Sequence, residues 1–217
     1  MPRRSRDPRP GLTRHRVLEA ALALVDEHGA QALTMRRLAT ALEVAPMTLY
    51  GHVAGRDELL DGLAEVMVAG IGVRFGDAPL EALRRLAHGI RAVATAHPAA
   101  FQLVGMRPLG TGASLAPVEA GLGALRGLGL DDAEAVRAYR VLVGYVRGYA
   151  LGEIATFTLQ RGSQPPVPGP AVDPARHPHI AELAPLLASA DRDETFALGV
   201  EVLLDGFAAR GAAADAG

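Results

Sequence analysis

The chain has 217 residues, of which 49% are hydrophobic, and a formal net charge of −2 at pH 7. That apolar content is sufficient for a buried core, and the absence of cysteine excludes disulfides, thiolate nucleophiles, zinc ribbons and iron–sulfur clusters. No apolar run approaches the roughly 20 residues of a membrane span, and the first residues lack the pattern of a secretion signal. We therefore expect a cytoplasmic protein that does not contact a membrane.

The positive charge is concentrated at the start of the chain. Residues 1–60 hold 9 arginines against 7 acidic residues, whereas residues 61–217 hold 13 against 17. We interpret residues 1–11 as a flexible basic arm that can lie along a phosphate backbone, because several arginines alternate there with prolines. A solvated tail without any partner would have the same composition.

Helical periodicity dominates the chain, and no segment shows the alternation of a strand, which predicts an all-α fold. The first apolar stripe predicts a helix over residues 13–28, with Thr13 as its N-cap. Thr34 caps a second, short helix, and Pro46 begins a third that extends to about His52. Two short helices joined by a tight turn are typical of a helix-turn-helix.

Longer helical segments follow. The predicted helices cover residues 57–73, 80–94, 99–105, 114–128, 131–157 and 191–210. Asp131 with Glu134 resembles a capping box at the start of the longest of them. Residues 161–178 contain six of the 15 prolines, so we expect a mobile surface loop there. The loop's His177 and His179 would make a poor metal site without further ligands.

The run from Leu12 to Leu63 closely resembles the DNA-binding domain of TetR-family transcriptional regulators. Its segments "LTMRRLA", "TLYGHV" and "RDELLD" match the family in order and spacing. The resemblance implies an N-terminal three-helix helix-turn-helix domain over residues 12–58 and a larger C-terminal helical effector-binding and dimerisation bundle over residues 59–217. It also implies a homodimeric repressor that binds a palindromic operator in double-stranded DNA and is released by a small molecule.

The resemblance and the geometry of a helix that begins near Ala45 together select the candidate DNA contacts. The N-terminal end of that helix reaches base edges, so Pro46, Met47 and Tyr50 are candidate base contacts, whereas Leu49 and Val53 share the buried face. The complete set of candidates is Thr34, Arg36, Ala45, Pro46, Met47, Thr48, Tyr50, Gly51, His52 and Arg56.

These candidates have different expected roles. Met47 and the Tyr50 ring can pack against thymine methyl groups, although a packing role within the protein is an alternative for both. Arg36 can bind guanine bidentately. The hydroxyls of Thr34, Thr48 and Tyr50 and the side chains of His52 and Arg56 can contact phosphates. Gly51 stands where the tetracycline-repressor branch has a tryptophan, so the family resemblance does not imply an operator sequence.

The second half, from "GMRPLG" through "GLGLDDAEAVRAYRVLVGYVRGYALGE", looks like the tetracycline-repressor branch of the family. In that branch, a histidine and a threonine bind the magnesium ion of the drug complex. Leu103 and Met106 stand at these positions and suit no hard cation, so we expect neither a metal nor a cofactor. The candidate pocket for a largely apolar effector comprises His97, Phe101, Leu103, Met106, Arg107, Tyr145 and Tyr149.

Alternatives remain open for several of these residues. His97 could instead cap a helix end, and the two tyrosines could be ordinary core aromatics. Gly144, Gly148 and Gly152 recur at helical spacing, each at a cost of about 1 kcal/mol relative to alanine. Close approach of another helix, within the subunit or across a twofold interface built with the last helix, would offset this cost. Coincidence in a glycine-rich chain would also explain the pattern.

Two other function classes compete with a repressor. One is an enzyme with an all-helical pocket, but no Gly-rich phosphate loop or nucleophile elbow is present, and we expect no enzymatic activity. The other is a helical small-molecule-binding or partner-binding protein that does not bind an operator.

Overall fold

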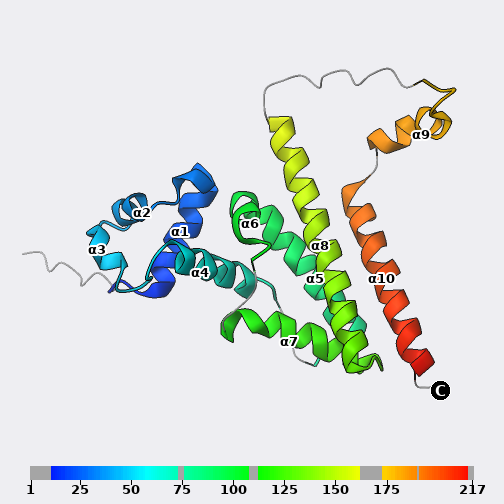
Figure 1. Cartoon of the computed structure of the whole chain (residues 1–217), viewed down its shortest axis with the longest axis horizontal. Coiled ribbons are helices and arrows are strands. Elements are labelled where there is room, and N and C mark those ends of the chain that lie inside the picture. Colours follow the sequence, from blue (N-terminus) through cyan, green and yellow to red (C-terminus); the bar gives the residue numbers. More distant parts are fainter. Residues whose placement is uncertain (1–10, 73–75, 108–111, 162–172, 190, 215–217) are drawn as a thin grey trace, which may run out of the picture. The chain divides into compact units, whose positions relative to one another are not determined.

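The computed structural model describes residues 11–72, 76–107, 112–161, 173–189 and 191–214. These residues form helices and turns without a strand, which confirms the all-α prediction (Figure 1). The elements in chain order are α1 (Arg14–His28), η1 (Ala30–Ala32), α2 (Met35–Ala41), α3 (Pro46–Leu49), α4 (Arg56–Ala69), α5 (Pro79–Ala96), α6 (Pro98–Val104), α7 (Gly112–Gly127), α8 (Asp132–Arg161), α9 (Pro178–Ser189) and α10 (Arg192–Ala214). Apart from Gly11, the predicted basic arm lies outside the described residues, as does most of the predicted 161–178 loop.

The chain forms two compact units. The first comprises residues 1–71 and 96–116, and the second comprises residues 72–95 and 117–217. Helices α4 and α6 therefore pack with the helix-turn-helix, although the predicted effector-binding domain begins at residue 59. A division into packed units does not test a division by function, so the boundary between residues 58 and 59 stays a prediction.

The first unit is held together by α1, α4 and α6, which contact one another around an apolar core. The predicted cap of α1 is confirmed, since the Thr13 hydroxyl accepts a hydrogen bond from the Arg16 amide at 3.2 Å. Helices α1 and α4 approach closely at Gly62, where a β-carbon would collide with Leu18. Arg14 on α1 also donates to Glu65 on α4 at 2.7 Å. Packing and charge together fix α4 against the first helix.

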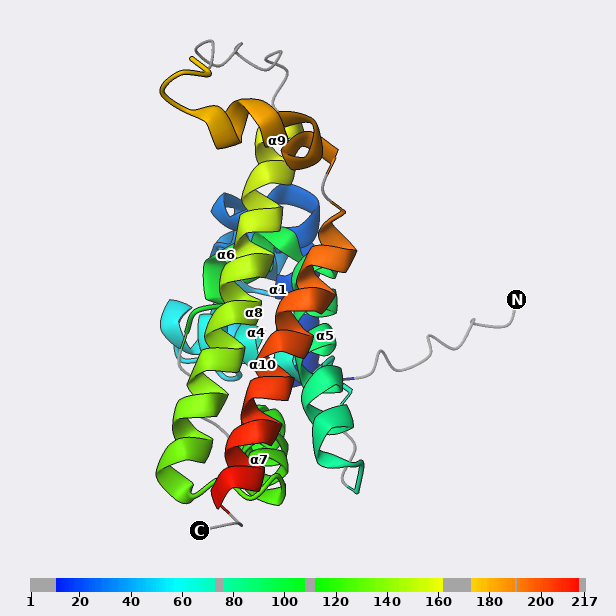
Figure 2. The same cartoon turned by 90° about the vertical axis from the view of Figure 1, so that its right-hand side faces the viewer.

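The second unit is built on α8, which begins as predicted. Asp131 accepts a hydrogen bond from the Glu134 amide at 2.7 Å, as an N-cap does. Helix α10 lies along α8 (Figure 2), and a β-carbon at Gly199 would collide with the Tyr145 phenol. Close approach of the two helices therefore depends on that glycine.

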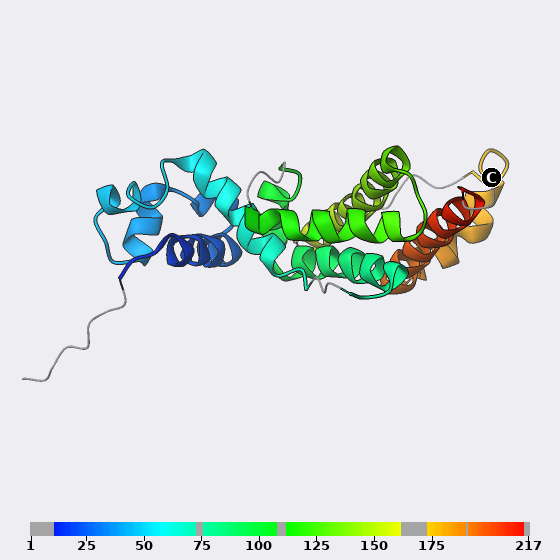
Figure 3. The ribbon, with the colours of Figure 1, turned by 90° about the horizontal axis from the view of Figure 1, so that it is seen from below.

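Helices α5 and α7 complete the second unit. In Figure 3, α5 runs alongside α7, and Gly121 of α7 lies against Leu86 of α5 and the Tyr139 ring of α8. Arg84 of α5 forms two hydrogen bonds to Glu201 of α10, at 2.6 and 2.7 Å. Both sides of α5 are thus tied to its neighbours.

Several predicted boundaries differ from the structure by a few residues, and one helix was not predicted. Helix α3 ends at Leu49, although hydrogen bonds from His52 and Val53 to the Leu49 carbonyl continue the turn. Helix α8 extends to Arg161 rather than to residue 157. Helix α9 has no predicted counterpart, because it contains Pro185 and its apolar side chains are exposed rather than arranged as a buried stripe.

Candidate DNA-binding site and effector domain

The turn between α2 and α3 sets the position of the candidate recognition helix. The Glu43 and Val44 amides donate to the Thr40 and Ala39 carbonyls at 3.1 and 3.0 Å, which closes α2 with a Schellman-type turn. Glu43 has φ 55°, in the left-handed region where glycine is the usual residue. This reversal allows α3 to begin only a few residues after α2 ends.

Helix α3 separates its side chains into a buried and an exposed side. Leu49 and Val53 are buried in the first unit, as predicted. Met47 is 76% exposed and Tyr50 is 46% exposed. The other predicted contacts of this segment are also exposed, namely Ala45, Pro46, Thr48 and Gly51. Most of Met47 and nearly half of Tyr50 are therefore exposed to solvent on the side of α3 opposite Leu49.

Two further candidates lie at the start of α2. The Thr34 hydroxyl accepts a hydrogen bond from the Arg37 amide at 3.2 Å, which confirms Thr34 as the N-cap. Arg36, two residues further along, is exposed, and its backbone carbonyl accepts a hydrogen bond from the Thr40 hydroxyl at 3.0 Å. Its guanidinium is accessible to a base edge or a phosphate.

Arg56 has a contact that sequence reasoning did not anticipate. Its Nη1 donates to the Leu33 carbonyl at 2.7 Å, which joins the start of α4 to the residue before the α2 N-cap. Next to it, the Glu58 carboxylate accepts a hydrogen bond from the Ala54 amide at 2.6 Å, which holds the residue before the N-cap against the first turn of α4. His52 is only partly exposed. The Arg56 pairing spans 23 residues, so no local pattern could have revealed it.

The predicted effector residues fall in both units. Five of them, His97, Phe101, Leu103, Met106 and Arg107, belong to the first unit, and Tyr145 and Tyr149 belong to the second. Phe101 is buried in the core, Leu103 is partly buried and Met106 is exposed.

The two polar residues that flank α6 are paired with helices of the first unit. The His97 Nδ1 lies 2.7 Å from an Asp26 carboxylate oxygen of α1. Arg107 donates to Asp61 of α4 at 2.9 Å. Helix α6 is therefore anchored at both ends to helices that carry the helix-turn-helix.

Tyr145 and Tyr149 are hydrogen-bonded to the backbone of α10. Their hydroxyls donate to the Phe196 carbonyl at 3.1 Å and to the Arg192 carbonyl at 2.7 Å. Burial raises the pKa of both phenols. These contacts are what core tyrosines make, so the structure gives the two residues a packing function whether or not they also touch an effector.

A network around Arg91 lies beside the tyrosines. Arg91 of α5 donates to Glu153 of α8 at 2.8 and 2.6 Å and to Asp193 at 2.6 Å. Its guanidinium carbon lies 4.7 Å from the centre of the Phe196 ring. The hydrogen bonds to Glu153, the largest cause, raise the pKa of Arg91. Arg91 therefore remains a cation and links three helices.

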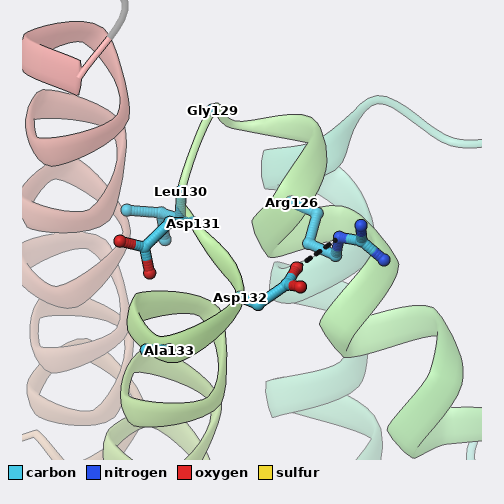
Figure 4. Close-up of a pocket in the computed structure, with 6 residues that line it drawn as sticks. All are labelled: Arg126, Gly129, Leu130, Asp131, Asp132 and Ala133. Atoms are coloured by element: carbon cyan, nitrogen blue, oxygen red, sulfur yellow. Dashed lines mark ion pairs between the residues drawn. The ribbon is translucent and has the colours of Figure 1, made fainter.

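A recess at the turn from α7 to α8 is lined by polar groups that already have partners. Figure 4 shows Arg126 directed toward Asp132, with 3.1 Å between the paired atoms. Asp131, on the same rim, caps α8. In the described part of the chain, no three His, Asp or Glu residues are grouped so that they could hold a metal ion. No helix described there is long and apolar enough to cross a membrane.

One face of α8 and one face of α10 are exposed although they carry apolar or small residues. On α8, Val141 is 50% exposed, and a β-carbon at Gly144 or Gly148 would meet no atom within 4 Å. On α10, Leu198 is 65% exposed and Val202 is 62% exposed. Close approach of a helix from the same chain therefore does not explain these two glycines.

Comparison with known proteins gives matches along nearly the whole chain. Residues 17–63 match the model of bacterial regulatory proteins of the tetR family, and residues 77–210 match the tetracyclin repressor-like C-terminal domain. The HTH-type transcriptional repressor DrrR1 of Streptomyces coeruleorubidus is 32% identical over 94% of this chain and 80% of its own length. The class E tetracycline repressor of Escherichia coli is 28% identical over 89% of this chain and 90% of its own.

Solved structures agree with these matches. A possible TetR family transcriptional regulator from Streptomyces coelicolor has a TM-score of 0.75 at 33% identity, covering 90% of this chain and 98% of that one. ActR from the same species, in complex with actinorhodin, has a TM-score of 0.78 at 26% identity, covering 93% and 99%. The chain therefore belongs to the TetR family of bacterial transcriptional regulators, as the sequence predicted.

Proposed function

We propose that the protein is a homodimeric repressor that binds a palindromic operator through α3 and releases it when a small, largely apolar effector binds. The observation that carries this proposal is the exposure of Met47 and Tyr50 beside the buried anchors Leu49 and Val53. A short helix held down by two apolar residues, with amphipathic residues projecting from it, is suited to insertion into a major groove.

The contacts divide into two kinds. Met47 and Tyr50 read bases through thymine methyl groups, and Arg36 binds guanine from α2. Thr34 and Thr48 donate hydroxyl hydrogen bonds to phosphates, which sets the register of the helix without selecting a sequence. Ala45, Pro46 and Gly51 allow the backbone to approach the groove, because all three have small or compact side chains. His52 extends the phosphate-facing edge, whereas Arg56 acts through its hydrogen bond to the Leu33 carbonyl, which braces the helix-turn-helix.

Dimerisation uses the exposed faces of α8 and α10. Val141, Leu198 and Val202 leave apolar surface in water in a single chain, and a second copy would bury it. Gly144 and Gly148 allow a helix of the second copy to approach closely, which offsets their cost in helix propensity. Two such pairs of helices form a four-helix interface.

Release by an effector is supported by relatives and by the anchoring of α6. ActR has been solved with actinorhodin bound, which shows that a related chain accommodates a small molecule. In this chain, His97 and Arg107 connect α6 to α1 and α4. An effector that binds the DNA-free arrangement more tightly lowers the affinity of the protein for its operator. By linkage, operator DNA lowers the affinity for the effector by the same factor.

The proposal is tested by footprinting the purified protein on the DNA upstream of its own gene. We expect two protected half-sites related by a twofold axis, about 34 Å or one helical turn apart, or a multiple of that spacing. Binding should weaken steeply with salt. Protection that is uniform along the DNA, or that is insensitive to salt, contradicts the proposal.

A further inference from the structure

Nearly all partly buried arginines of the described residues are paired with a carboxylate. The pairs are Arg14 with Glu65, Arg84 with Glu201, Arg85 with Asp77, Arg91 with Glu153, and Arg107 with Asp61. Arg147 of α8 is the exception in the described part of the chain: it is partly buried, and no hydrogen bond or ion pair engages its guanidinium. A guanidinium stays charged, so burying part of it without an anion costs free energy. At the other five arginines, the attraction of the paired carboxylate offsets this cost.

Arg147 lies at one edge of the buried face of α8. Val143, one turn earlier, and Ile154, two turns later, are both buried. Tyr139 precedes it by two turns, and its ring lies beside Gly121 of α7, which Leu86 of α5 also approaches. Helix α10 packs against the other edge, through Tyr145. Arg147 is therefore on the edge of α8 that lies away from α10.

The Tyr139 hydroxyl shares the isolation of Arg147. Tyr145 and Tyr149 donate to backbone carbonyls, whereas no hydrogen bond engages the Tyr139 hydroxyl in the described residues. Burial raises the pKa of Tyr139 and lowers that of Arg147, and the positive charge of Arg147 partly opposes the change at Tyr139. Each side chain thus has hydrogen-bond donors that no described group uses.

Both groups remain accessible to water. Among the described side chains, no nitrogen or oxygen is fully buried without a hydrogen-bond partner. The guanidinium of Arg147 and the hydroxyl of Tyr139 therefore keep contact with solvent, and a small molecule can replace that water. A guanidinium fork binds a carboxylate through two parallel hydrogen bonds, and a phenol can donate a third.

We propose that Arg147 and Tyr139 bind the carboxylate of the effector, and that the effector is an apolar carboxylic acid. The neighbours Val143, Ile154 and the Tyr139 ring suit the apolar body of such a molecule, and its anion supplies the partner that Arg147 lacks. This inference rests on the proposed function, since it assigns a chemical class to the molecule that releases the operator.

The test uses the full chain and matched pairs of probes in titration calorimetry. The carboxylates are phenylacetate, 2-naphthylacetate and 9-anthracenecarboxylate, each compared with its neutral amide. We expect at least one carboxylate to bind about tenfold or more tightly than its amide. Arg147→Met should weaken that carboxylate on the order of 10- to 100-fold and leave the amide unchanged. Arg147→Lys should restore part of the loss, and Tyr139→Phe should cost about fivefold.

Arg140→Met is the matched control, because it removes an exposed arginine from the same helix and should change nothing. The melting temperature of the Arg147→Met protein should be no lower than that of the native protein, which excludes a folding defect. The proposal is overturned if none of the carboxylates binds, if they bind no better than their amides, or if Arg147→Met binds them normally.

Operator binding without a carboxylate separates this inference from the proposed function. Native and Arg147→Met proteins should bind the operator with equal affinity, and the preferred carboxylate should release only the native protein. If native protein binds no operator, the proposed function fails, whereas selective carboxylate binding that depends on Arg147 would still stand.

Discussion

Replacing Arg56 by methionine tests whether this residue contacts phosphate or braces the helix-turn-helix. Methionine keeps the apolar stem of the side chain but removes the charge and the hydrogen bond from Nη1 to the Leu33 carbonyl, which measures 2.7 Å. A hydrogen bond from a charged donor contributes about 1.5–3 kcal/mol, and partial exposure of this one favours the lower end. We therefore expect operator affinity to fall roughly tenfold.

Two measurements distinguish a brace from a phosphate contact. A brace acts on the position of α2 and α3, so Arg56→Met should weaken the operator more than random DNA, and the slope of log affinity against log salt should stay the same. A phosphate contact would weaken both DNAs equally and would lower the slope by about 0.9. Fluorescence anisotropy with operator and random duplexes over a salt series gives both quantities.

Arg176→Met is the control, since it removes one exposed arginine from the second unit. It should leave operator affinity, random-DNA affinity and the salt slope unchanged. An equal loss on both DNAs together with a smaller slope in Arg56→Met would refute the brace and would support the direct phosphate contact that the sequence suggested.

Three further changes test other parts of the structure. Leu198→Asp combined with Val202→Asp should convert the dimer to a monomer in sedimentation velocity, because the two aspartates would place charges in the apolar interface. A dimer that remains unchanged would exclude this face as the interface. Gly199→Ala should lower the free energy of unfolding by about 1–3 kcal/mol, because its β-carbon collides with Tyr145. Gly51→Ala should raise it by about 0.4–1 kcal/mol, because its β-carbon meets only the Thr48 carbonyl, at 3.5 Å. Urea unfolding that ranks the two variants in the opposite order contradicts the packing described. The hydrogen bond from Arg84 lowers the pKa of Glu201, so the contribution of this ion pair to stability is present above the ordinary carboxyl pKa and is lost as pH falls through the lowered pKa. Glu201→Gln should therefore reduce the loss of unfolding free energy at acid pH. Unfolding curves of the variant that coincide with those of the native protein at every pH would count against the pair.

Local signals predicted much of the fold. Helices α1 and α8 have long apolar stripes and side-chain N-caps, and these features depend only on neighbouring residues. Helix α9 was missed because its apolar residues stay exposed and Pro185 lies within it. Helix α3 was predicted too long because the turn after Leu49 keeps helix-like hydrogen bonds without remaining regular helix.

The candidate sites were predictable to different extents. Helical spacing predicts that Leu49 is buried and that Met47 and Tyr50 are exposed, and the structure confirms this difference. The partners of Arg56 and His97 could not be predicted, since they lie 23 and 71 residues away in the sequence. The isolation of Arg147 was equally hidden, because the sequence contains 22 arginines and only tertiary packing determines which of them lack a carboxylate.

The most direct test of the account is the ratio of operator affinity to random-DNA affinity for native protein and for Tyr50→Ala. Native protein should prefer the operator by about 1,000-fold or more at physiological salt. Tyr50→Ala should lose on the order of tenfold of that preference, with its melting temperature and its affinity for random DNA unchanged, because Tyr50 is exposed and reads bases. A Tyr50→Ala protein with the full native preference, or a native protein without preference for any upstream sequence, would contradict the assignment of α3 as the recognition helix.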